Sequence, residues 1–529
     1  MRFKDELAEA RPEALLGTRR RFLTLAGAAT VLALSTRLPG SGTAYSSART
    51  LSGYPFTLGI ASGDPLPDSV VLWTRLAPEA LVPFGGMPYA PVDVEWELAH
   101  DEAFRRIAAR GVEVAWPEVG HSVHVDVKGL EPGREYFYRF VAGGERSPIG
   151  RTRTAPAAGN GALKFAMVSC QSWHAGFYTA YKHLVNEDVD VVLHLGDYIY
   201  EFATDPVGGA RNTPIPESAQ VPTESLDQYR QRYAVYKTDP DLQAAHAAAP
   251  FIVTWDDHEV VNNYADENTT NDQPEAEFLL RRANGYRAYW ENMPLRLPSK
   301  PAGPDMQLYR RFRYGDLVEF NVLDTRQYRD RQPGAAGQDR FDPTRTILGA
   351  EQEQWLLDGL SASPARWNVL AQQVLMAQLD SDPGAGTSIP TDAWDGYAAN
   401  RIRVADALTQ RRISNPVVLC GDVHRHQASH VKGDYRVANA PIVAPEFTCT
   451  SISSAGDGSV ETPNAANLLR ANPHLEMTTS QRGYVTCTVT PDTWHTDFRV
   501  VPYITRPGAP VSTHASYAVE NGNPQMETA

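Results

Sequence analysis

Four short groups of polar residues, of types that bind metals or transfer protons, directly follow apolar runs of this 529-residue sequence. In chain order the groups are Ser169-Cys170-Gln171, Gly196-Asp197-Tyr198-Ile199-Tyr200-Glu201, Asp256-Asp257-His258-Glu259 and Gly421-Asp422-Val423-His424-Arg425-His426. Carboxylates suit hard cations, and thiolates and imidazoles suit transition metals. The four groups therefore predict a metal centre if the fold brings them together.

Any one of these groups alone is weak support for a metal site. A Gly-Asp pair after a strand is more often a plain turn, and an isolated His-x-His is more often surface or satisfied core. For Cys170 the ordinary alternative is a small buried hydrophobe, and for Tyr200 it is a ring packed on the sheet edge. The four groups together are a strong indication, because open α/β sheets place ligand sites at the carboxyl ends of their strands.

The apolar runs before these groups predict buried strands. The runs are continuously apolar, as strands of a sheet covered on both faces are, and helix-like stretches such as 275–291 lie between several of them. The predicted strands are Phe165–Val168, Val189–Leu195, Phe251–Trp255 and Pro416–Cys420. This alternation predicts an α/β sandwich as the second and catalytic domain, over residues 164–515.

Residues 51–154 have a different pattern, which predicts a small β-sandwich of the immunoglobulin or fibronectin kind. Short alternating runs are separated by Pro-Gly and Gly-Gly turns, as antiparallel strands are. These runs lie at Val70–Thr74, Val92–Trp96, Val123–Val127 and Tyr136–Phe140. The stretch 152–163 is rich in Ala, Gly and Pro and predicts a linker to the second domain.

Composition is that of a globular protein and narrows the class of partners. Hydrophobic residues make up 42%, charged residues 21%, and the formal net charge is -14 at pH 7. An acidic chain repels polyanions, which argues against a nucleic-acid scaffold. Four cysteines are too few for a disulfide-built fold. Cys449 and Cys487 lie in short β-like runs and could pair in an oxidising compartment, and the sequence leaves this open.

The N-terminal segment 1–48 resembles a twin-arginine export signal. The pair Arg19-Arg20 precedes an apolar run over 25–34 and a region of small residues that ends at Ala48. This run is too short to span a bilayer, and no other run is long and apolar enough. We expect recognition by the twin-arginine export machinery and a secreted, periplasmic or cell-wall-associated protein with no membrane span. The cleavage point stays open.

The order Gly-Asp, Asp-His-Glu and Gly-Asp-x-His resembles a variant of the calcineurin-like metallophosphatase pattern. In the common pattern the first motif is Asp-x-His, and here Ser169-Cys170 replaces it, while Asp257 replaces an asparagine and Asp422 a histidine. With these replacements, the motifs resemble those of the PhoD-like alkaline phosphatases and phosphodiesterases. The other hallmarks of that family match at 197–201, 255–259, 323–329 and 392–397. The resemblance covers both domains and implies a metallophosphatase-type α/β sandwich preceded by the small β-sandwich.

The resemblance also implies Fe³⁺ together with Ca²⁺, and the residue types agree with Fe³⁺. Cys170, Asp197, Tyr200 and His424 form a set of anionic and borderline donors that suits a trivalent iron. Tyrosine ligation in particular favours Fe³⁺ over Zn²⁺. We therefore expect these four residues to bind the iron.

Hard oxygen donors suit the second kind of cation. Asp197 can bridge to a neighbouring ion through its other oxygen, and Asp257 and Asp422 add carboxylates of the kind that Ca²⁺ prefers. Asn262 is a weaker candidate for an amide ligand, because it also fits a turn cap. The predicted calcium ligands are therefore Asp197, Asp257 and Asp422.

Two further residues are predicted to act on the substrate. His258 corresponds by motif to the metallophosphatase histidine beside the leaving-group oxygen, where it would contact phosphate or donate a proton; the alternative is another metal ligand. Arg326 could clamp non-bridging phosphate oxygens with its two-pronged guanidinium. The alternative for Arg326 is an ion pair at the end of a strand.

These parts predict an exported metal-dependent phosphomonoesterase or phosphodiesterase in which a metal-bound hydroxide attacks phosphorus. A phospholipase D-like phosphodiesterase on the same fold shares the motifs, so phosphomonoesters, phosphodiesters and phospholipid headgroups all stay open as substrates. A non-catalytic carbohydrate- or surface-binding protein could use the β-sandwich but would not need the four strand-end motifs. An exported redox protein could use Cys and Tyr on iron, but hard carboxylates favour Lewis-acid chemistry.

Overall fold

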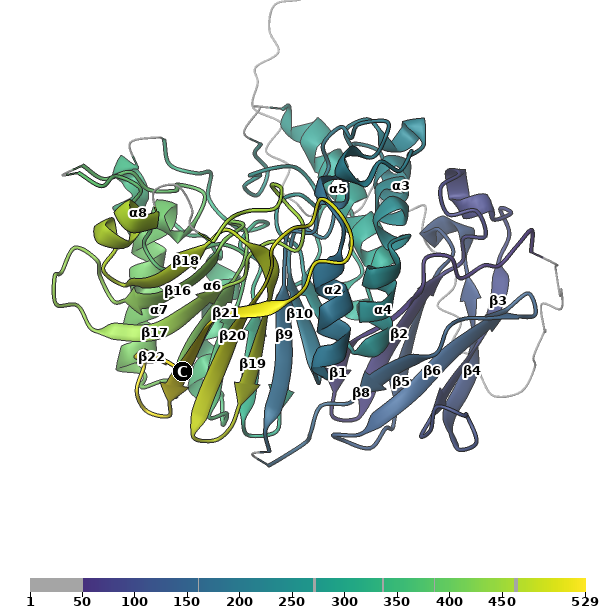
Figure 1. Ribbon diagram of the computed structural model, residues 1–529, viewed down its shortest axis with the longest axis horizontal. Coiled ribbons are helices and arrows are strands. Elements are labelled where there is room, and N and C mark those ends of the chain that lie inside the picture. Colours follow the sequence, from purple (N-terminus) through teal and green to yellow (C-terminus); the bar gives the residue numbers. More distant parts are fainter. Residues whose placement is uncertain (1–50, 160, 270–272, 335–336, 385, 461–464) are drawn as a thin grey trace, which may run out of the picture. The chain divides into compact units, whose positions relative to one another are not determined.

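Two large sheets and one smaller sheet form the framework of the chain (Figure 1). The structure is a computed structural model that describes residues 51–529 except 160, 270–272, 335–336, 385 and 461–464. The predicted export signal over 1–48 lies outside the described residues. Among the described residues, no helix has the length and apolarity needed to cross a membrane.

The first large sheet has ten strands. They are β1 (Ile60–Leu66), β2 (Ser69–Arg75), β5 (Ser122–Lys128), β9 (Leu163–Val168), β10 (Val191–Leu195), β11 (Phe251–Thr254), β19 (Arg482–Val489), β20 (Thr493–Val501), β21 (Ser512–Glu520) and β22 (Met526–Thr528). Their spatial order is β22-β21-β20-β19-β9-β10-β11-β1-β2-β5. The neighbours β9, β10 and β11 are parallel, so three of the four polar groups leave the sheet at one edge.

The second large sheet has seven strands and supplies the fourth group. The strands are β12 (Arg310–Tyr314), β13 (Val318–Val322), β14 (Trp367–Ala371), β15 (Pro416–Cys420), β16 (His426–Lys432), β17 (Ile442–Thr448) and β18 (Leu475–Thr479). Their order is β12-β13-β14-β15-β17-β16-β18. The strands β13, β14, β15 and β17 run parallel to one another.

Helices cover the outer faces of the two sheets, and the sheets pack on each other. The first sheet is covered by α2 (Thr179–Leu184), α3 (Leu226–Lys237), α4 (Pro240–Ala248) and α5 (Glu275–Asn292). The second sheet is covered by α6 (Ala350–Ala362) and α7 (Ala398–Gln410), and the short α8 (Ala465–Ala471) lies beside β18. Figure 1 shows α2 in blue, α3 to α5 in teal, and α6 and α7 in green. The fold class predicted from the sequence is confirmed.

The alternation of side chains within β10 explains its continuously apolar sequence. Val191, Leu193 and Leu195 point into the core between the two sheets, and Val192 points into the core beneath the helices. Both faces are therefore buried, as predicted, but helices cover only one of them. The other sheet covers the second face, which a local sequence pattern cannot distinguish from a second helical layer.

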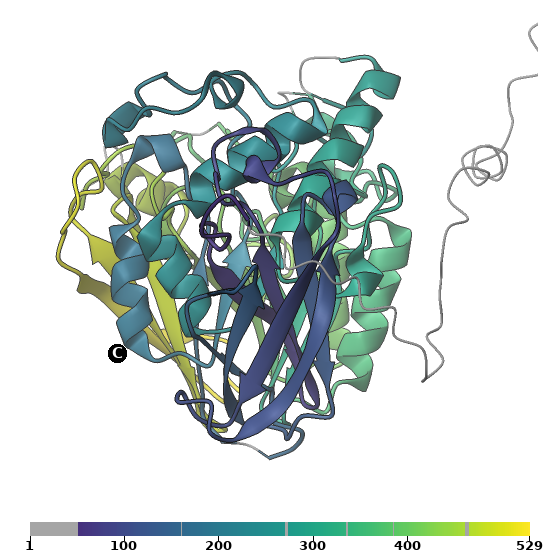
Figure 2. The same cartoon turned by 90° about the vertical axis from the view of Figure 1, so that its right-hand side faces the viewer.

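The N-terminal strands form a sandwich whose two halves belong to different sheets (Figure 2). One half is the five-stranded sheet of β3 (Val92–Ala99), β4 (Ile107–Ala115), β6 (Glu135–Ala142), β7 (Glu145–Arg146) and β8 (Gly150–Arg153). The other half is β1, β2 and β5, which extend the ten-stranded sheet because β1 pairs with β11 at Gly63 and Phe251. The core of the sandwich includes Val70, Val94 and Tyr138.

The predicted linker over 152–163 is only partly a linker. Its first two residues belong to β8, and Ala155 is fully buried with its N–H donated to the carbonyl of Leu66 at 3.2 Å. Thr154 is also buried and donates its N–H to the carbonyl of Arg134 at 3.1 Å. Composition alone gave the wrong result here, because small residues also suit close packing against a sheet.

Candidate metal centre

The carboxyl ends of strands from both large sheets meet at one place. Cys170 follows β9, Asp197 follows β10, Asp257 follows β11, and His424 follows β15. Donor atoms of Cys170, Asp197 and His424 all lie within 4.8 Å of one another, and so do donor atoms of Asp197, Asp257 and His258. Asp197 belongs to both groups. The structure thus brings the predicted ligands together around one shared carboxylate.

Four residues of this cluster have the left-handed backbone conformation. The φ angles are 58° at Cys170, 58° at Asp197, 65° at Asp422 and 52° at His424. For a side chain other than glycine this conformation costs about 1–2 kcal/mol. These residues lie just beyond the ends of β9, β10 and β15, where the donor atoms gather. Strained backbone of this kind clusters at functional sites.

The glycines of the two Gly-Asp pairs are required by close approach. Gly196 has a φ of 108°, and a Cβ there would lie 2.4 Å from the Cβ of Asp256 and 2.6 Å from its backbone nitrogen. A Cβ at Gly421 would lie 2.5 Å from the hydroxyl of Ser169. Each glycine therefore lets two strand ends touch directly behind the ligands.

The phenol of Tyr200 lies between the predicted iron ligands. Its hydroxyl donates to Asp197 Oδ2 at 3.1 Å and lies 3.0 Å from His424 Nε2, and it accepts a hydrogen bond from Ser454 at 2.7 Å. The Tyr200 side chain is only 4% exposed. The structure thus places this ring at the cluster and its oxygen within reach of two other donors.

Burial sets the ionisation of the cluster in the absence of cations. Burial, with the neighbouring carboxylate and thiol, raises the pKa of Tyr200 well above its usual value. Burial and Asp197 raise the pKa of Cys170 well above its usual range, and burial with Asp257 and Asp256 does the same for Asp197 despite the opposing charge of His258. The raised pKa values favour the protonated, neutral forms of Tyr200, Cys170 and Asp197. A cation bound beside them would favour their anionic forms.

Three buried carboxylate oxygens of the site have no hydrogen-bond partner among the described residues. They are Asp197 Oδ1, Asp256 Oδ2 and Asp257 Oδ1. An unpaired polar atom away from water is costly, and bound cations are a common reason for one. Together with the thiol, phenol and imidazole, these free oxygens fit a centre that holds hard and trivalent cations.

Arg326 lies beneath the carboxylates and is fully buried. Its Nε donates to Asp256 and its Nη1 donates to Asp392 at 2.7 Å. The remaining nitrogen, Nη2, lies 3.6 Å from both Asp257 and Asp422. The Asp422 side chain is 26% exposed, so this carboxylate forms part of the open side of the site. The guanidinium of Arg326 is thus surrounded by four acidic side chains.

His258 is held by an acidic partner. Its Nδ1 lies 2.6 Å from Glu201 Oε2, and the other oxygen of Glu201 accepts the backbone N–H of Asn262 at 2.8 Å. Burial disfavours the imidazolium, but Asp257, Asp197 and Glu201 outweigh burial and raise the pKa of His258 well above its usual value. The structure therefore places His258 next to the predicted ligands, with surroundings that favour its protonated form and with Nε2 not bound by Glu201.

Two family models match the chain, one for each part of the fold. A model described as PhoD-like phosphatase matches residues 165–498, and a model described as the N-terminal domain of PhoD-like phosphatases matches residues 42–156. The chain belongs to the PhoD-like phosphatase family.

Relatives of this PhoD-like phosphatase are similar over nearly their whole length. Alkaline phosphatase D of Bacillus subtilis (strain 168) is 49% identical over 512 residues, which cover 95% of this chain and 87% of that protein. A solved structure described as the structure of PhoD has a TM-score of 0.86 and 48% identity, and the match covers 90% of this chain and 92% of that one.

Several residues that support the site of this PhoD-like phosphatase were not singled out from the sequence. Glu259 accepts the backbone N–H groups of Asp197, Tyr198 and Asp256 at 3.2, 2.6 and 2.9 Å, so it ties the ends of β10 and β11 together. Burial raises the pKa of Glu259 to about 8. Its place in the Asp-Asp-His-Glu group was a signal for this role, as was the place of Glu201 in the second group.

Asn263 and Ser454 also contact the cluster. The backbone N–H of Asn263 donates to Asp257 at 2.6 Å, and its side-chain amide, in the orientation that satisfies both of its ends, donates to the same carboxylate at 2.9 Å. The neighbouring Asn262, the weaker ligand candidate, holds Glu201 through its backbone. Ser454 lies in a serine-rich stretch without any motif, so no local signal in the sequence pointed to it.

The other cysteines and the second histidine of the last group are not in the cluster. All four cysteines are free thiols. Cys449 and Cys487 do not pair: the Cys449 thiol contacts the carbonyl of Met167 at 3.3 Å, and the Cys487 thiol lies 3.6 Å from the hydroxyl of Thr496. His426 is buried and accepts the N–H of Thr450 at 3.2 Å, so it has a structural role.

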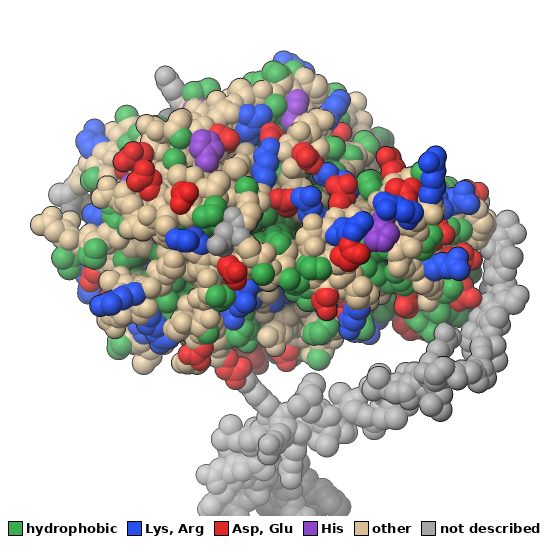
Figure 3. All heavy atoms as spheres, turned by 90° about the horizontal axis from the view of Figure 1, so that it is seen from below, with side chains coloured by type: hydrophobic (Ala, Val, Ile, Leu, Met, Phe, Trp, Pro, Cys, Tyr) green, Lys and Arg blue, Asp and Glu red, His purple; other side chains and the backbone are tan. Residues whose placement is uncertain are grey.

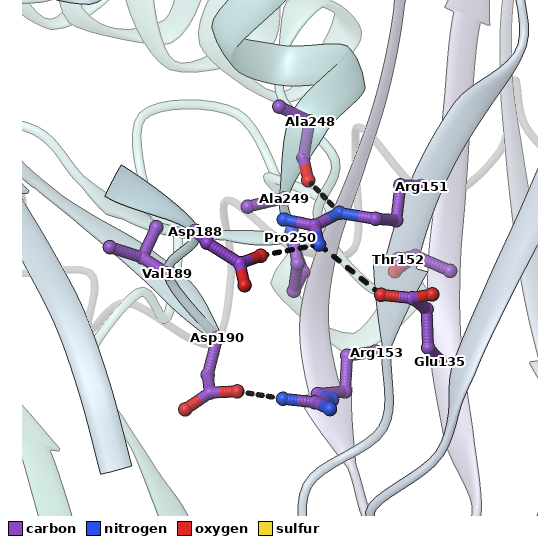
Figure 4. Close-up of a pocket in the computed structure, with 10 residues that line it drawn as sticks. All are labelled: Glu135, Arg151, Thr152, Arg153, Asp188, Val189, Asp190, Ala248, Ala249 and Pro250. Atoms are coloured by element: carbon purple, nitrogen blue, oxygen red, sulfur yellow. Dashed lines mark hydrogen bonds and ion pairs between the residues drawn. The ribbon is translucent and has the colours of Figure 1, made fainter. Parts of the chain in front are cut away.

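A small cavity of about 70 Å³ lies at the opposite ends of the same strands (Figure 4). Figure 4 shows Arg151 of β8 turned toward Asp188 and Glu135, with N–O distances of 2.6 and 3.2 Å, and Arg153 turned toward Asp190. Both guanidinium groups are neutralised by carboxylates. These ion pairs therefore connect β8 to the start of β10. Neither arginine of this cavity is left unpaired to bind a phosphate.

Proposed function

We propose that this PhoD-like phosphatase is an exported, metal-dependent phosphoester hydrolase. The observation that carries the proposal is the shared carboxylate Asp197, which joins two groups of buried donor atoms and keeps one oxygen unpaired. Family membership supports the reaction class. The Arg19-Arg20 segment supports export by the twin-arginine route to the outside of the cytoplasmic membrane.

The donors divide between two kinds of cation. Cys170, Asp197, Tyr200 and His424 would hold Fe³⁺, and Asp197, Asp257 and Asp422 would hold Ca²⁺. Bound at these donors, the cations neutralise phosphate oxygens and make a water acidic enough to serve as the nucleophile. The raised pKa values of Cys170 and Tyr200 mean that both protons leave when iron binds, so iron binding should strengthen as the pH rises.

His258 supplies the acid in this proposal. Glu201 binds Nδ1, so the proton on Nε2 is the one available to the departing oxygen. As the bond between phosphorus and this oxygen breaks, the oxygen takes that proton and leaves as a neutral alcohol. Glu201 orients the imidazole ring. Because it binds Nδ1, Nε2 is the nitrogen that faces the leaving group.

Arg326 acts in this proposal as a positioning residue. Its fork is occupied by Asp256 and Asp392 and it is fully buried, so we propose that it offsets the charge of the clustered carboxylates. This role corresponds to the ion-pair alternative given for Arg326 from the sequence, rather than to the phosphate clamp. Without Arg326, the repulsion among four neighbouring acids would spread the ligands apart.

A metal and substrate analysis tests the proposal. Protein purified after export should contain iron and hydrolyse phosphoesters, lose activity when a chelator removes Ca²⁺, and regain it when Ca²⁺ is returned. Asp257→Asn should weaken the response to Ca²⁺ while iron is retained. Zinc as the sole bound metal, or a metal-loaded protein inactive on monoesters and diesters alike, would refute it.

A further inference from the structure

An exposed aromatic ring borders the buried metal centre. Phe202 is 45% exposed, whereas the rings beside it, Tyr200 and His258, are 4% and 8% exposed. The ring centroids of Phe202 and His258 lie 4.9 Å apart with the planes at 73°, an edge-to-face contact. Phe202 is therefore in direct contact with the proposed acid and also faces solvent.

The backbone that carries Phe202 is fixed in place. The buried guanidinium of Arg232 donates to the carbonyls of Tyr200 and Phe202, the latter at 2.7 Å. The same guanidinium donates to the carbonyls of Ala219 and Val221 at 3.0 and 2.9 Å. Arg232 thus clamps both ends of the loop between them.

Backbone hydrogen bonds pair the two ends of this loop as well. The N–H of Thr204 donates to Gln220, and the N–H of Thr223 donates to Glu201, both at 2.9 Å. This pairing fixes the backbone of Phe202, whose side chain stays 45% exposed. An exposed apolar ring is thus held at a fixed place, where an apolar partner would bury surface that stays in contact with water in the free protein.

We propose that Phe202 determines substrate specificity by packing against an apolar or aromatic group on the leaving-group side of the phosphoester. This inference rests on the proposed function, because His258 marks the side on which the leaving group departs. The favoured substrates are esters whose alcohol carries a flat or apolar group, such as a phenol, a nucleoside or an acylglycerol. Esters of small polar alcohols leave the ring of Phe202 without a partner.

The test compares Phe202→Ala with the unchanged metal-loaded protein on phenyl phosphate and glycerol phosphate. We expect kcat/KM for phenyl phosphate to fall about tenfold, mainly through KM, because an aromatic contact contributes roughly 0.5–1.5 kcal/mol beyond its buried area. The value for glycerol phosphate should change less than about twofold. Phe202→Leu should lose about threefold on phenyl phosphate, since it keeps apolar area without a flat ring.

A matched control comes from the same loop. Val207 is 48% exposed, and Val207→Ala removes a similar exposed apolar group away from the His258 ring, so both substrates should be hydrolysed as before. Iron content and thermal midpoint should stay unchanged in every variant. Two further substrates, a nucleoside monophosphate and a glycerophospholipid in mixed micelles, distinguish the kind of apolar group that Phe202 binds. The substrate class that packs on Phe202 should show the larger loss of kcat/KM in Phe202→Ala.

Two results would overturn the inference alone. An equal fall on phenyl phosphate and glycerol phosphate would mean that Phe202 only positions His258, and unchanged kinetics on both would mean that the ring contacts no substrate. A different result would refute the proposed function itself: the unchanged, metal-loaded protein would hydrolyse no phosphoester at all. The two failures are therefore distinguishable.

Discussion

Single atoms decide the chemistry of this site, beginning with the phenol oxygen of Tyr200. That oxygen contacts Asp197, His424 and Ser454, and burial holds its proton in place when no cation is near. A cation that replaced this proton would bind the phenolate oxygen directly. It would then lie close to the three side chains that contact this oxygen. Visible absorption of the iron-loaded protein therefore tests directly whether Tyr200 binds the iron.

Tyr200→Phe should remove the visible absorption of the iron-loaded protein. A phenolate bound to Fe³⁺ gives ligand-to-metal charge transfer, and a phenyl ring has no oxygen to donate. Iron retention should fall at least about tenfold, as it does when metal-site partners are lost. Absorption spectra and metal analysis measure both effects. A coloured, active, iron-loaded Tyr200→Phe protein would show that Tyr200 is only a packing ring.

His258→Ala is the contrast to that variant. Colour and iron content should survive, because His258 is not an iron ligand in the proposal. Turnover should fall about 100-fold or more on esters with poor leaving groups, which need a proton, and much less on those with good leaving groups. Loss of colour together with activity would place His258 among the ligands instead.

The sequence predicted which residues the structure brings together better than it predicted the residues that support them. Cys170, Asp197 and His424 were found because each follows an apolar strand, and position after a strand is a local property. Ser454 reaches Tyr200 from 254 residues away, so nothing near it in the chain could reveal the contact. Arg326 lies beside Asp257 and Asp422, but its partners Asp256 and Asp392 come from other elements, and the sequence could not show that they bind its Nε and Nη1.

At the scale of elements, the ends of strands do most to shape the site. The glycines that follow β10 and β15 allow β10 to touch β11 and β15 to touch β9. The strands themselves were predictable from continuous apolar runs. Their division between two sheets was not, because β15 has the same pattern as β10 although it belongs to the other layer.

Gly196→Ala should destabilise the protein and disrupt the metal centre. The new Cβ would overlap the backbone of Asp256, and a φ of 108° is unfavourable for alanine, so we expect a loss of about 3 kcal/mol or more. Gly129→Ala is the matched control, since Gly129 has a φ of 75° with open space around it and should lose only about 1–2 kcal/mol. Denaturant titration of both variants measures the difference, and equal losses would contradict the role given to close approach.

The end of α3 carries a buried amine whose charge depends on pH. Lys237 is 2% exposed, its Nζ donates to Tyr198 at 3.1 Å, and it lies 4.2 Å from the ring centre of Trp73. Burial, aided by Arg75, lowers the pKa of Lys237 to about 7. The facing histidines His194 and His246 have lowered pKa values and stay neutral above pH 7.

Lys237→Met should therefore stabilise the protein more at pH 6 than at pH 10. At pH 6 the amine is charged in both folded and unfolded chains, and burying that charge costs most. Between pH 7 and about 10.4 the folded amine is neutral and the unfolded amine still binds a proton, so the free energy of unfolding rises with pH. Urea titrations of both proteins at the two pH values measure the difference. A pH-independent difference would contradict this account.

The whole molecule depends on a sheet shared by its N-terminal strands and its catalytic strands. Because β1 pairs with β11, the sandwich is not an appendage joined by a tether. The contact joins residues nearly two hundred positions apart, so the local patterns that revealed both strands could not reveal their pairing.

Figure 3 shows acidic and basic side chains interspersed over the face away from the site, without a large area of one charge sign.

A chain that begins at residue 157 should fail to fold as a soluble protein. It would lack β1, β2 and β5, so the edge of β11 and apolar side chains beside it would be open to water, a known cause of aggregation. The chain from residue 51 should instead unfold in one calorimetric transition. A soluble, iron-binding fragment from residue 157, or two separate transitions in the longer chain, would show that the parts are independent.

The predicted ligand residues come from both large sheets, so a bound metal would favour the folded chain. A cation bound to Asp197 of one layer and His424 of the other acts as a cross-link between the layers that exists only in the folded chain. By mass action it stabilises that state by about 4 kcal/mol at a thousandfold excess over its dissociation constant. Under the proposed function, metal supply would therefore set how much folded protein is ready for export. A chain that leaves the cell already folded would take its metals from the cytoplasm and keep them afterwards.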